Sequence, residues 1–133
     1  MSYFTDCLER VQFVVLTDGI RWCRENLNWD HVVFSTGRSA AVDLAIASLC
    51  DHAIITAGSF SWWAGWFANG VTITNRDVSR PGSALSKRIR REDYYKPDWV
   101  ALSPGDYRRP MFHNHSVRAD GTKAPTPNNI TIT

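Results

Sequence analysis

Four short runs rich in β-branched residues alternate with helix-patterned segments along the first half of this 133-residue chain. The runs occupy residues 12–17, 31–34, 53–56 and 71–74. Apolar side chains recur at the three- and four-residue spacing of amphipathic helices over 20–27, 40–49 and 60–68. Strands joined by helices of about ten residues form right-handed β-α-β units, which need a mostly parallel sheet. The sequence therefore predicts an α/β fold, a Rossmann-like parallel sheet with flanking helices.

The size of the chain favours a single ordinary core. With 133 residues and 44% hydrophobic content, one domain is the default, and we assign it to residues 1–102, beginning with a helix pattern over 3–11. Residues 103–133 change to Pro, Gly, Asn, Thr and Arg with few large apolar side chains. Such a segment cannot bury enough surface to offset the entropy of ordering it. We therefore expect 103–133 to be a largely disordered tail.

Charge and cysteine usage exclude several classes of partner. A formal charge of +2 is too small to indicate nucleic acid, and the basic run 87–91 is followed at once by Glu92 and Asp93, as on a solvated helix face. The three cysteines show no C-x-x-C spacing, so neither a metal site nor a disulfide framework is predicted. No apolar run approaches about 18 residues and no signal peptide is evident, so we expect no membrane anchor in this sequence.

The stretch from 43 to 70 has the order of elements that builds a ligand site. A buried strand is followed by a Gly-Ser turn and then by a helix that opens at Phe60 and Ser61. The carboxyl end of a parallel strand and the amino end of the next helix meet where free N–H groups and the helix dipole favour an anion. This order predicts a nucleotide-type crevice at Gly58, Ser59, Phe60 and Ser61.

No catalytic group can be identified from the residues alone. Asp18 follows a strand, and a capping role and a ligand role are equally open for it. Asp43 lies one turn into a helix, where a solvated charge is the usual interpretation. Ser59 and Ser61 lack the Gly-x-Ser-x-Gly elbow of a hydrolase, and His52 is more typical of a packed histidine than of a base. Three tryptophans at 62, 63 and 66 are interpreted mainly as helix–sheet packing.

Several segments, in order, resemble the C-terminal part of the galactoside α-1,2-fucosyltransferase family. They are residues 13–18, 22–27, 49–55 and 58–66. The likeness covers 3–102 and excludes the tail. Phe-Ser-Trp-Trp at 60–63 is similar to the bacterial and invertebrate members.

The resemblance implies transfer of L-fucose from GDP-fucose to the 2-hydroxyl of a terminal galactoside, with inversion and with neither a metal nor another cofactor. It implies the GT-B fold, whose C-terminal half holds the nucleotide sugar. Members from animals are Golgi membrane proteins, facing the lumen, with an N-terminal anchor. The sequons at Asn114 and Asn129 are candidate glycan acceptors in that compartment.

The resemblance also implies roles for the candidate site residues. Asp18 matches a strand-end aspartate of a shared motif. Asp43 matches an aspartate 16 residues before a serine, where it would contact the guanine base. Ser59, with Phe60 and Ser61, matches the turn that contacts the phosphates. These five residues form the predicted GDP-fucose site.

The sequence departs from the family at one motif. Members carry His-x-Arg-Arg-x-Asp before the segment that begins here at Tyr3, and its arginine neutralises the leaving GDP. This sequence contains no such motif, and Arg90-Arg91-x-Asp93 lies downstream without the histidine. We therefore expect a partial fucosyltransferase that is inactive alone. The alternatives are a non-catalytic GDP-sugar-binding module or inactive paralogue, and a generic Rossmann-like domain for another nucleotide.

Overall fold

The computed structural model describes residues 1–8, 10–68, 70–103 and 128–133. The elements, in chain order, are α1 (Ser2–Thr5), β1 (Val11–Leu16), α2 (Ile20–Asn26), β2 (Val32–Ser35), α3 (Ala40–Ser48), β3 (His52–Ile55), α4 (Ser59–Phe67), β4 (Thr72–Asn75), the 3-10 helix η1 (Arg91–Asp93), β5 (Val100–Leu102) and β6 (Asn128–Ile132). None of the described helices is long and apolar enough to cross a membrane.

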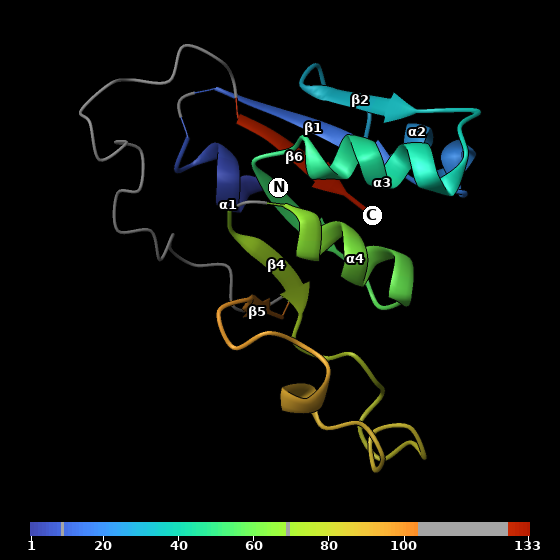
Figure 1. Ribbon diagram of the computed structural model, residues 1–133, viewed down its shortest axis with the longest axis vertical. Helices are drawn as coiled ribbons and strands as arrows, with labels where there is room; N and C mark the ends of the chain where they lie inside the picture. The colour runs from blue at the N-terminus through green and yellow to red at the C-terminus, as the bar shows by residue number, and fades with distance from the viewer. Residues whose placement is uncertain (9, 69, 104–127) are drawn as a thin grey trace.

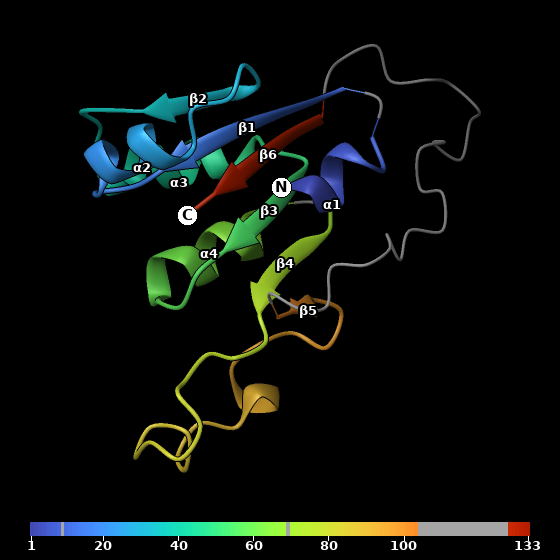
Figure 2. The same cartoon turned by 180° about the vertical axis from the view of Figure 1, so that it is seen from behind.

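The six strands form one sheet in the order β2-β1-β6-β3-β4-β5, and every pair is parallel. Helices α3 and α4 cover one face, while α1 and α2 lie on the other (Figures 1 and 2). The two faces follow from handedness: the chain moves one way from β1 to β2 and the opposite way from β2 to β3, so right-handed crossovers place α2 and α3 on opposite sides. The predicted Rossmann-like α/β fold is confirmed.

Part of the predicted tail is a central strand of this sheet. Residues 128–132 form β6, which pairs with β1 on one side and β3 on the other. Its residues Ile130 and Thr131 are both fully buried. The prediction of disorder is therefore wrong for this segment. Its two isoleucines lie between two strands, and the apolar surface buried there offsets the entropy of ordering five residues. The prediction for 104–127 falls outside the described residues.

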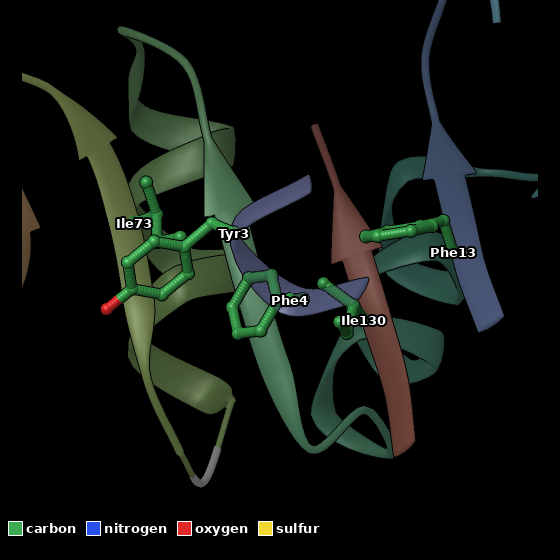
Figure 3. Close-up of a cluster of buried hydrophobic side chains, with 5 residues drawn as sticks. All are labelled: Tyr3, Phe4, Phe13, Ile73 and Ile130. Atoms are coloured by element: carbon green, nitrogen blue, oxygen red, sulfur yellow. The ribbon is translucent and has the colours of Figure 1, made fainter. Parts of the chain in front are cut away.

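The core on the α1 face is built around two aromatic side chains. Phe4 and Phe13 are fully buried and pack with Tyr3, Ile73 and Ile130 (Figure 3). The helix predicted over 3–11 is only one turn long, since Val11 pairs with the sheet and begins β1. This short turn nevertheless places Phe4 directly over the centre of the sheet.

On the other face, α3 and α4 pack together through small residues. Ala47 and Ala64 are fully buried and meet Leu16 of β1. Gly65 brings α4 close to the sheet, and its carbonyl accepts a hydrogen bond of 3.0 Å from the Thr72 hydroxyl. This contact holds the carboxyl half of α4 against the sheet.

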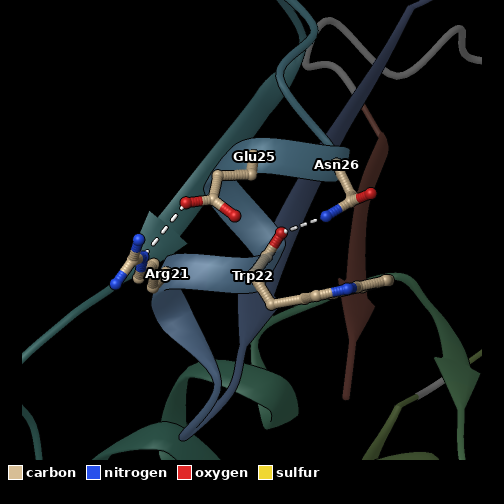
Figure 4. Close-up of polar contacts among 4 residues, drawn as sticks. All are labelled: Arg21, Trp22, Glu25 and Asn26. Carbon is tan, nitrogen blue, oxygen red and sulfur yellow. Dashed lines mark hydrogen bonds and ion pairs between the residues drawn. The ribbon is translucent and has the colours of Figure 1, made fainter.

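Helix α2 is short and stabilised at its surface. Arg21 and Glu25 form an ion pair of 3.1 Å one turn apart, and the Asn26 amide donates to the Trp22 carbonyl at 2.8 Å (Figure 4). The Asn26 bond links the last residue of α2 to the turn before it. Trp22 itself is 63% exposed, so this helix covers the sheet with few apolar side chains.

Candidate functional site

The turns that hold all of the predicted site residues lie along one edge of the sheet. Because every strand is parallel, the carboxyl ends of β1, β2, β3 and β6 share that edge. Ligands of open α/β sheets bind where the strand order reverses, outside the carboxyl ends. The reversal here lies between β1 and β3, with β6 between them. Beyond β6, Thr133 remains bonded to β3, since its N–H donates to the Ile54 carbonyl at 3.1 Å.

Asp18 lies in the turn between β1 and α2 with an exposed side chain. Asp18 does not cap α2, because the N-cap residue of this helix is Gly19 and no side chain makes a cap hydrogen bond there. The nearby hydroxyl of Thr17 instead accepts from the Gly19 N–H at 3.0 Å. The Asp18 carboxylate therefore points to solvent at the edge, where a ligand can reach it.

Asp43 is held in place in the first turn of α3. One of its carboxylate oxygens, Oδ1, accepts a hydrogen bond of 2.7 Å from the hydroxyl of Ser35, the last residue of β2. The capping role at this helix belongs to Ser39, whose hydroxyl accepts from the Val42 N–H at 3.4 Å. Asp43 is thus an oriented, partly buried acceptor rather than a loose surface charge. Sequence reasoning missed Ser35, whose only signal was a polar residue ending an apolar strand.

The turn before α4 leaves backbone donors without a cap. Gly58 adopts φ +135° and ψ 155°, a conformation essentially restricted to glycine. No side chain caps the helix, and its first hydrogen bond runs from the Trp62 N–H to the Gly58 carbonyl at 3.0 Å. The N–H groups of Ser59, Phe60 and Ser61 precede that bond and have no partner within the helix. This is the arrangement that favours an anion.

The two serines of this turn differ in environment. Ser61 is buried, and its hydroxyl lies 3.0 Å from the Thr56 hydroxyl, so it closes the turn from beneath. Ser59 is exposed, and its hydroxyl faces solvent. Phe60 is half-buried against the α3–α4 core. Of the three, Ser59 is therefore the side chain free to contact a ligand, while Ser61 and Phe60 hold the turn.

Three inter-strand steps separate β2 from β3. At about 4.8 Å a step, the turn bearing Asp43 and the turn bearing Ser59 belong to strands about 14 Å apart. A ligand that contacts both must be extended and must present an anion at one end and hydrogen-bond donors at the other. A nucleoside diphosphate has this form.

Two arginines of the basic run at 87–91 make local side-chain contacts. Arg90 pairs with Glu92 at 2.8 Å, while Arg91 donates to the Asn75 carbonyl at 3.1 Å and lies over the Tyr95 ring. These contacts leave Arg91 beside the end of β4, next to the strand that precedes α4. No group of His, Cys, Asp and Glu side chains suited to a metal occurs in the described parts of the chain.

His52 is packed, as predicted. Its Nδ1 accepts from the Val71 N–H at 3.0 Å and its ring stacks on Phe4 at 5.1 Å. Burial lowers its pKa, with a smaller opposing effect from the nearby Asp51 carboxylate. A histidine held neutral in this way is structural.

The predicted role of the tryptophans in helix–sheet packing is confirmed for Trp62 and is wrong for Trp63 and Trp66. Trp62 packs with Trp99, and its Nε1 donates to the Tyr94 carbonyl at 2.6 Å. Trp63 and Trp66 are 46% and 48% exposed. Helix α4 therefore presents an outer aromatic face, because the sheet covers only one side of it.

Comparison with known proteins identifies relatives of one kind. A family model, "Glycosyl transferase family 11", matches residues 1–103. Pig galactoside alpha-(1,2)-fucosyltransferase 1 is 35% identical over 108 residues, which are 77% of this chain and 30% of the relative. Rat galactoside alpha-(1,2)-fucosyltransferase 2 is 38% identical over 71% of this chain and 28% of its own length.

Bovine galactoside 2-alpha-L-fucosyltransferase SEC1 is 35% identical over 68% of this chain and 26% of its own length. The chain therefore spans less than a third of the length of the curated relatives it matches. No solved structure matches it. Strand β6 lies outside the residues that match the family model.

Proposed function

We propose that this chain forms the donor-binding part of a galactoside 2-alpha-L-fucosyltransferase, because the chain belongs to glycosyl transferase family 11. The reaction is transfer of L-fucose from GDP-fucose to the 2-hydroxyl of a terminal galactoside. The sheet would then be the C-terminal half of a GT-B enzyme. The observation that carries the proposal is the uncapped, serine-bearing turn before α4 at the strand-order reversal, within a segment that matches this family.

Each of the three turns has a task in this proposal. The N–H groups of the α4 turn and the Ser59 hydroxyl bind the diphosphate. Asp43 accepts from the N–H groups of the guanine base, in an orientation set by the Ser35 hydroxyl. Asp18 lies at the end of β1, nearer the reversal, where it contacts the part of the donor between base and fucose.

The chemical step breaks the bond between fucose C1 and the diphosphate oxygen, whose electron pair leaves with GDP, as the galactoside 2-hydroxyl attacks C1 from the opposite face and loses its proton to solvent. Negative charge develops on the departing GDP in the transition state. Preorganised N–H donors therefore stabilise the transition state more than they stabilise bound GDP-fucose. The α4 turn supplies donors of this kind. The family arginine that would add a cation belongs to a motif that this sequence does not contain. We therefore propose that this chain alone binds the donor without transferring fucose.

A chimera tests the transfer function. In pig galactoside alpha-(1,2)-fucosyltransferase 1, the matched segment is replaced by residues 1–103 of this chain. We expect radiolabelled fucose to pass from GDP-fucose to lactose or N-acetyllactosamine. A folded chimera that binds GDP and transfers no fucose would contradict the enzyme proposal.

A non-catalytic GDP-sugar-binding module is the second candidate. It predicts GDP binding by this chain and an inactive chimera. A Rossmann-like domain for another nucleotide predicts that GDP binds no better than ADP or UDP.

Location in the Golgi lumen is a further part of the proposal and rests on the family. It makes Asn114 and Asn129 candidate glycan acceptors. Asn114 lies outside the described residues, and Asn129 is half-buried in β6. Expression through the secretory pathway followed by glycan removal tests both sites, because each occupied sequon adds a discrete mass.

A further inference from the structure

Helices α3 and α4 form a solvent-facing layer that carries almost no charge. Each helix is described in full and has nine residues, and Asp43 is the only charged residue in the two. Its carboxylate is held by the Ser35 hydroxyl at the end of β2. A helix with water on one side normally carries charged residues there, whereas a helix that is apolar all round is covered. The composition of this layer is therefore that of a covered surface.

The outer face of α4 is an aromatic ridge made of Trp63, Trp66 and Phe67. These positions follow the three- and four-residue spacing that puts side chains on one side of a helix. The Trp63 ring lies 6.4 Å from the Trp66 ring and 5.8 Å from the Phe67 ring, measured between centroids. Each of the three residues is between 42% and 48% exposed. The ridge is therefore one continuous apolar surface in contact with water.

The outer face of α3 carries a stripe of small residues. Ala41, Ala45 and Ser48 are all exposed and recur at spacings of four and three residues. The two helices cover the same face of the sheet (Figure 1), and Ala47 of α3 shares one buried cluster with Ala64 of α4. These two alanines therefore lie at about the same height along the layer. The outer surface is low along α3 and high along α4.

The exposed apolar area is large enough for a specific contact between proteins. At about 200 Å² for each aromatic side chain, the half-exposed ridge presents about 300 Å². Val42 and Leu49 of the α3 segment are 41% and 81% exposed and bring the face to about 500 Å², the size of a functional patch. Two such faces bury about 1,000 Å² together, which is where specific interfaces begin.

The absence of charge determines which partner suits this face. A charged partner would bury its charges against apolar side chains without compensation. Helices that bind a lipid surface carry Lys and Arg on their polar side, and α3 and α4 contain neither. A second copy of the same face brings no free charge, and its aromatic ridge fits over small side chains. The face is thus complementary to itself.

We propose that two copies of this chain associate through α3 and α4, about a two-fold axis parallel to the helices. Such an axis lays the ridge of each copy over the small-residue stripe of the other, and it keeps every residue at its own height along the layer. Because Ala47 and Ala64 lie at about the same height, Trp63 of one copy meets Ala45 of the other. Trp66 meets Ser48 in the same way. This inference does not depend on the proposed function.

Sedimentation of the full chain at rising concentration tests the association. We expect a reversible equilibrium between monomer and dimer with a Kd in the micromolar range, on the order of 10 μM, as is typical of a small apolar interface. A chain that stays monomeric up to about 1 mM would overturn the proposal. A monomer that cosediments with phosphatidylcholine vesicles would also overturn it, because the face would then be a lipid contact.

Two charge substitutions test which residues meet. Ala45→Glu puts a carboxylate in the small-residue stripe, and Trp63→Lys puts an ammonium group in the ridge. Each should weaken the dimer by about one-hundred-fold or more, because a two-fold interface buries the unpaired charge twice. Ala84→Glu is the matched control, since it makes the same change at an exposed residue outside both helices, and its dimer should be unchanged. Circular dichroism checks that each variant is folded.

A mixture of the two variants tests the two-fold arrangement itself. In a mixed dimer the introduced carboxylate faces the introduced ammonium group, while the other contact between positions 45 and 63 stays native. We therefore expect the mixture to dimerise where each variant alone does not. Equal dimerisation of Ala45→Glu and Ala84→Glu, or a mixture that stays monomeric, would overturn the proposal. Ser48→Glu with Trp66→Lys repeats the test one turn along the helices and keeps it decisive where a variant of the first pair does not fold.

Discussion

Asp43 carries a hydrogen bond that its place in the first turn of a helix does not require. A carboxylate that served only the helix dipole would need no partner, yet the Ser35 hydroxyl holds one of its oxygens at 2.7 Å. The bond fixes the direction of the side chain before any ligand arrives. Such preorganisation is typical of a group that accepts hydrogen bonds from a ligand.

Asp43→Asn tests this role. The substitution keeps the shape and replaces the acceptor pair with one acceptor and one donor, so we expect GDP to bind about ten- to one-hundred-fold more weakly. Asp30→Asn is the matched control, because Asp30 is an exposed aspartate before β2, at the opposite edge of the sheet. Isothermal titration with GDP measures both. Equal affinities for the two variants would remove Asp43 from the site.

His52 predicts how stability depends on pH. Burial lowers the pKa of this imidazole in the folded chain, so the unfolded chain binds the proton more readily. Stability is therefore complete above the ordinary value of 6.5 and falls as the pH drops from there toward the lowered pKa. Urea midpoints between about pH 7.5 and about pH 5.5 measure the slope. His52→Asn should reduce that slope, and an unchanged slope would assign the effect to another group.

At the scale of elements, the close approach of α4 to the sheet depends on a glycine near the carboxyl end of the helix. A Cβ at Gly65 would lie 2.9 Å from Thr72 Cγ2 and 3.2 Å from Ile55 Cδ1, so α4 reaches this depth only without a side chain there. The same helix carries the uncapped turn at its start. Helix α4 therefore contributes both to the packing of the sheet and to the proposed ligand site.

Gly65→Ala should destabilise the chain by about 1–3 kcal/mol, the usual cost of overpacking a core. Gly19→Ala is the control, since its Cβ would meet only Thr17 Oγ1 at an ordinary 3.6 Å, and it should stay within about 0.5 kcal/mol of the parent. Denaturant unfolding measures both. A neutral Gly65→Ala would mean that α4 can shift, and this contact would not set the distance between the helix and the sheet.

Ser59→Ala tests the turn itself. Loss of one hydroxyl donor to a charged phosphate should weaken GDP binding about ten-fold or more, with stability unchanged because Ser59 is exposed. Ser48→Ala, at the far end of α3, is the matched control and removes a hydroxyl that donates to the Ala45 carbonyl of the same helix. If both variants bind GDP equally well, the phosphates lie elsewhere.

Sequence reasoning located the elements from β1 to β4 within a residue or two, because each strand is an apolar run and each helix has a clear period. It missed β5, a three-residue strand, and β6, five residues within a polar segment. A central strand supplied from about a hundred residues away depends on pairing that no local pattern encodes. The bond between Ser35 and Asp43 was out of reach for the same reason, since it joins a strand end to a helix.

At the scale of the whole molecule, one edge of a parallel sheet gathers everything the donor proposal needs. The end of β1 contributes Asp18, the turn after β2 leads to Asp43, and the turn after β3 leads to Ser59. The strand order reverses between β1 and β3, so Asp18 and Asp43 lie on one side of the reversal and Ser59 lies on the other. That convergence follows from topology. The order of strands and helices predicted the turn at 58–61 as a ligand site, whereas ligand roles for Asp18 and Asp43 came only from the family resemblance.

The most direct test of this account is calorimetric titration of the chain with GDP, ADP and UDP under matched conditions. Donor binding through the α4 turn and Asp43 predicts saturable heat with GDP, little or none with ADP or UDP, and a clear loss of GDP affinity in Asp43→Asn. Equal binding of all three nucleotides, or no binding of GDP by the folded chain, would contradict the assignment of this edge as a GDP-fucose site.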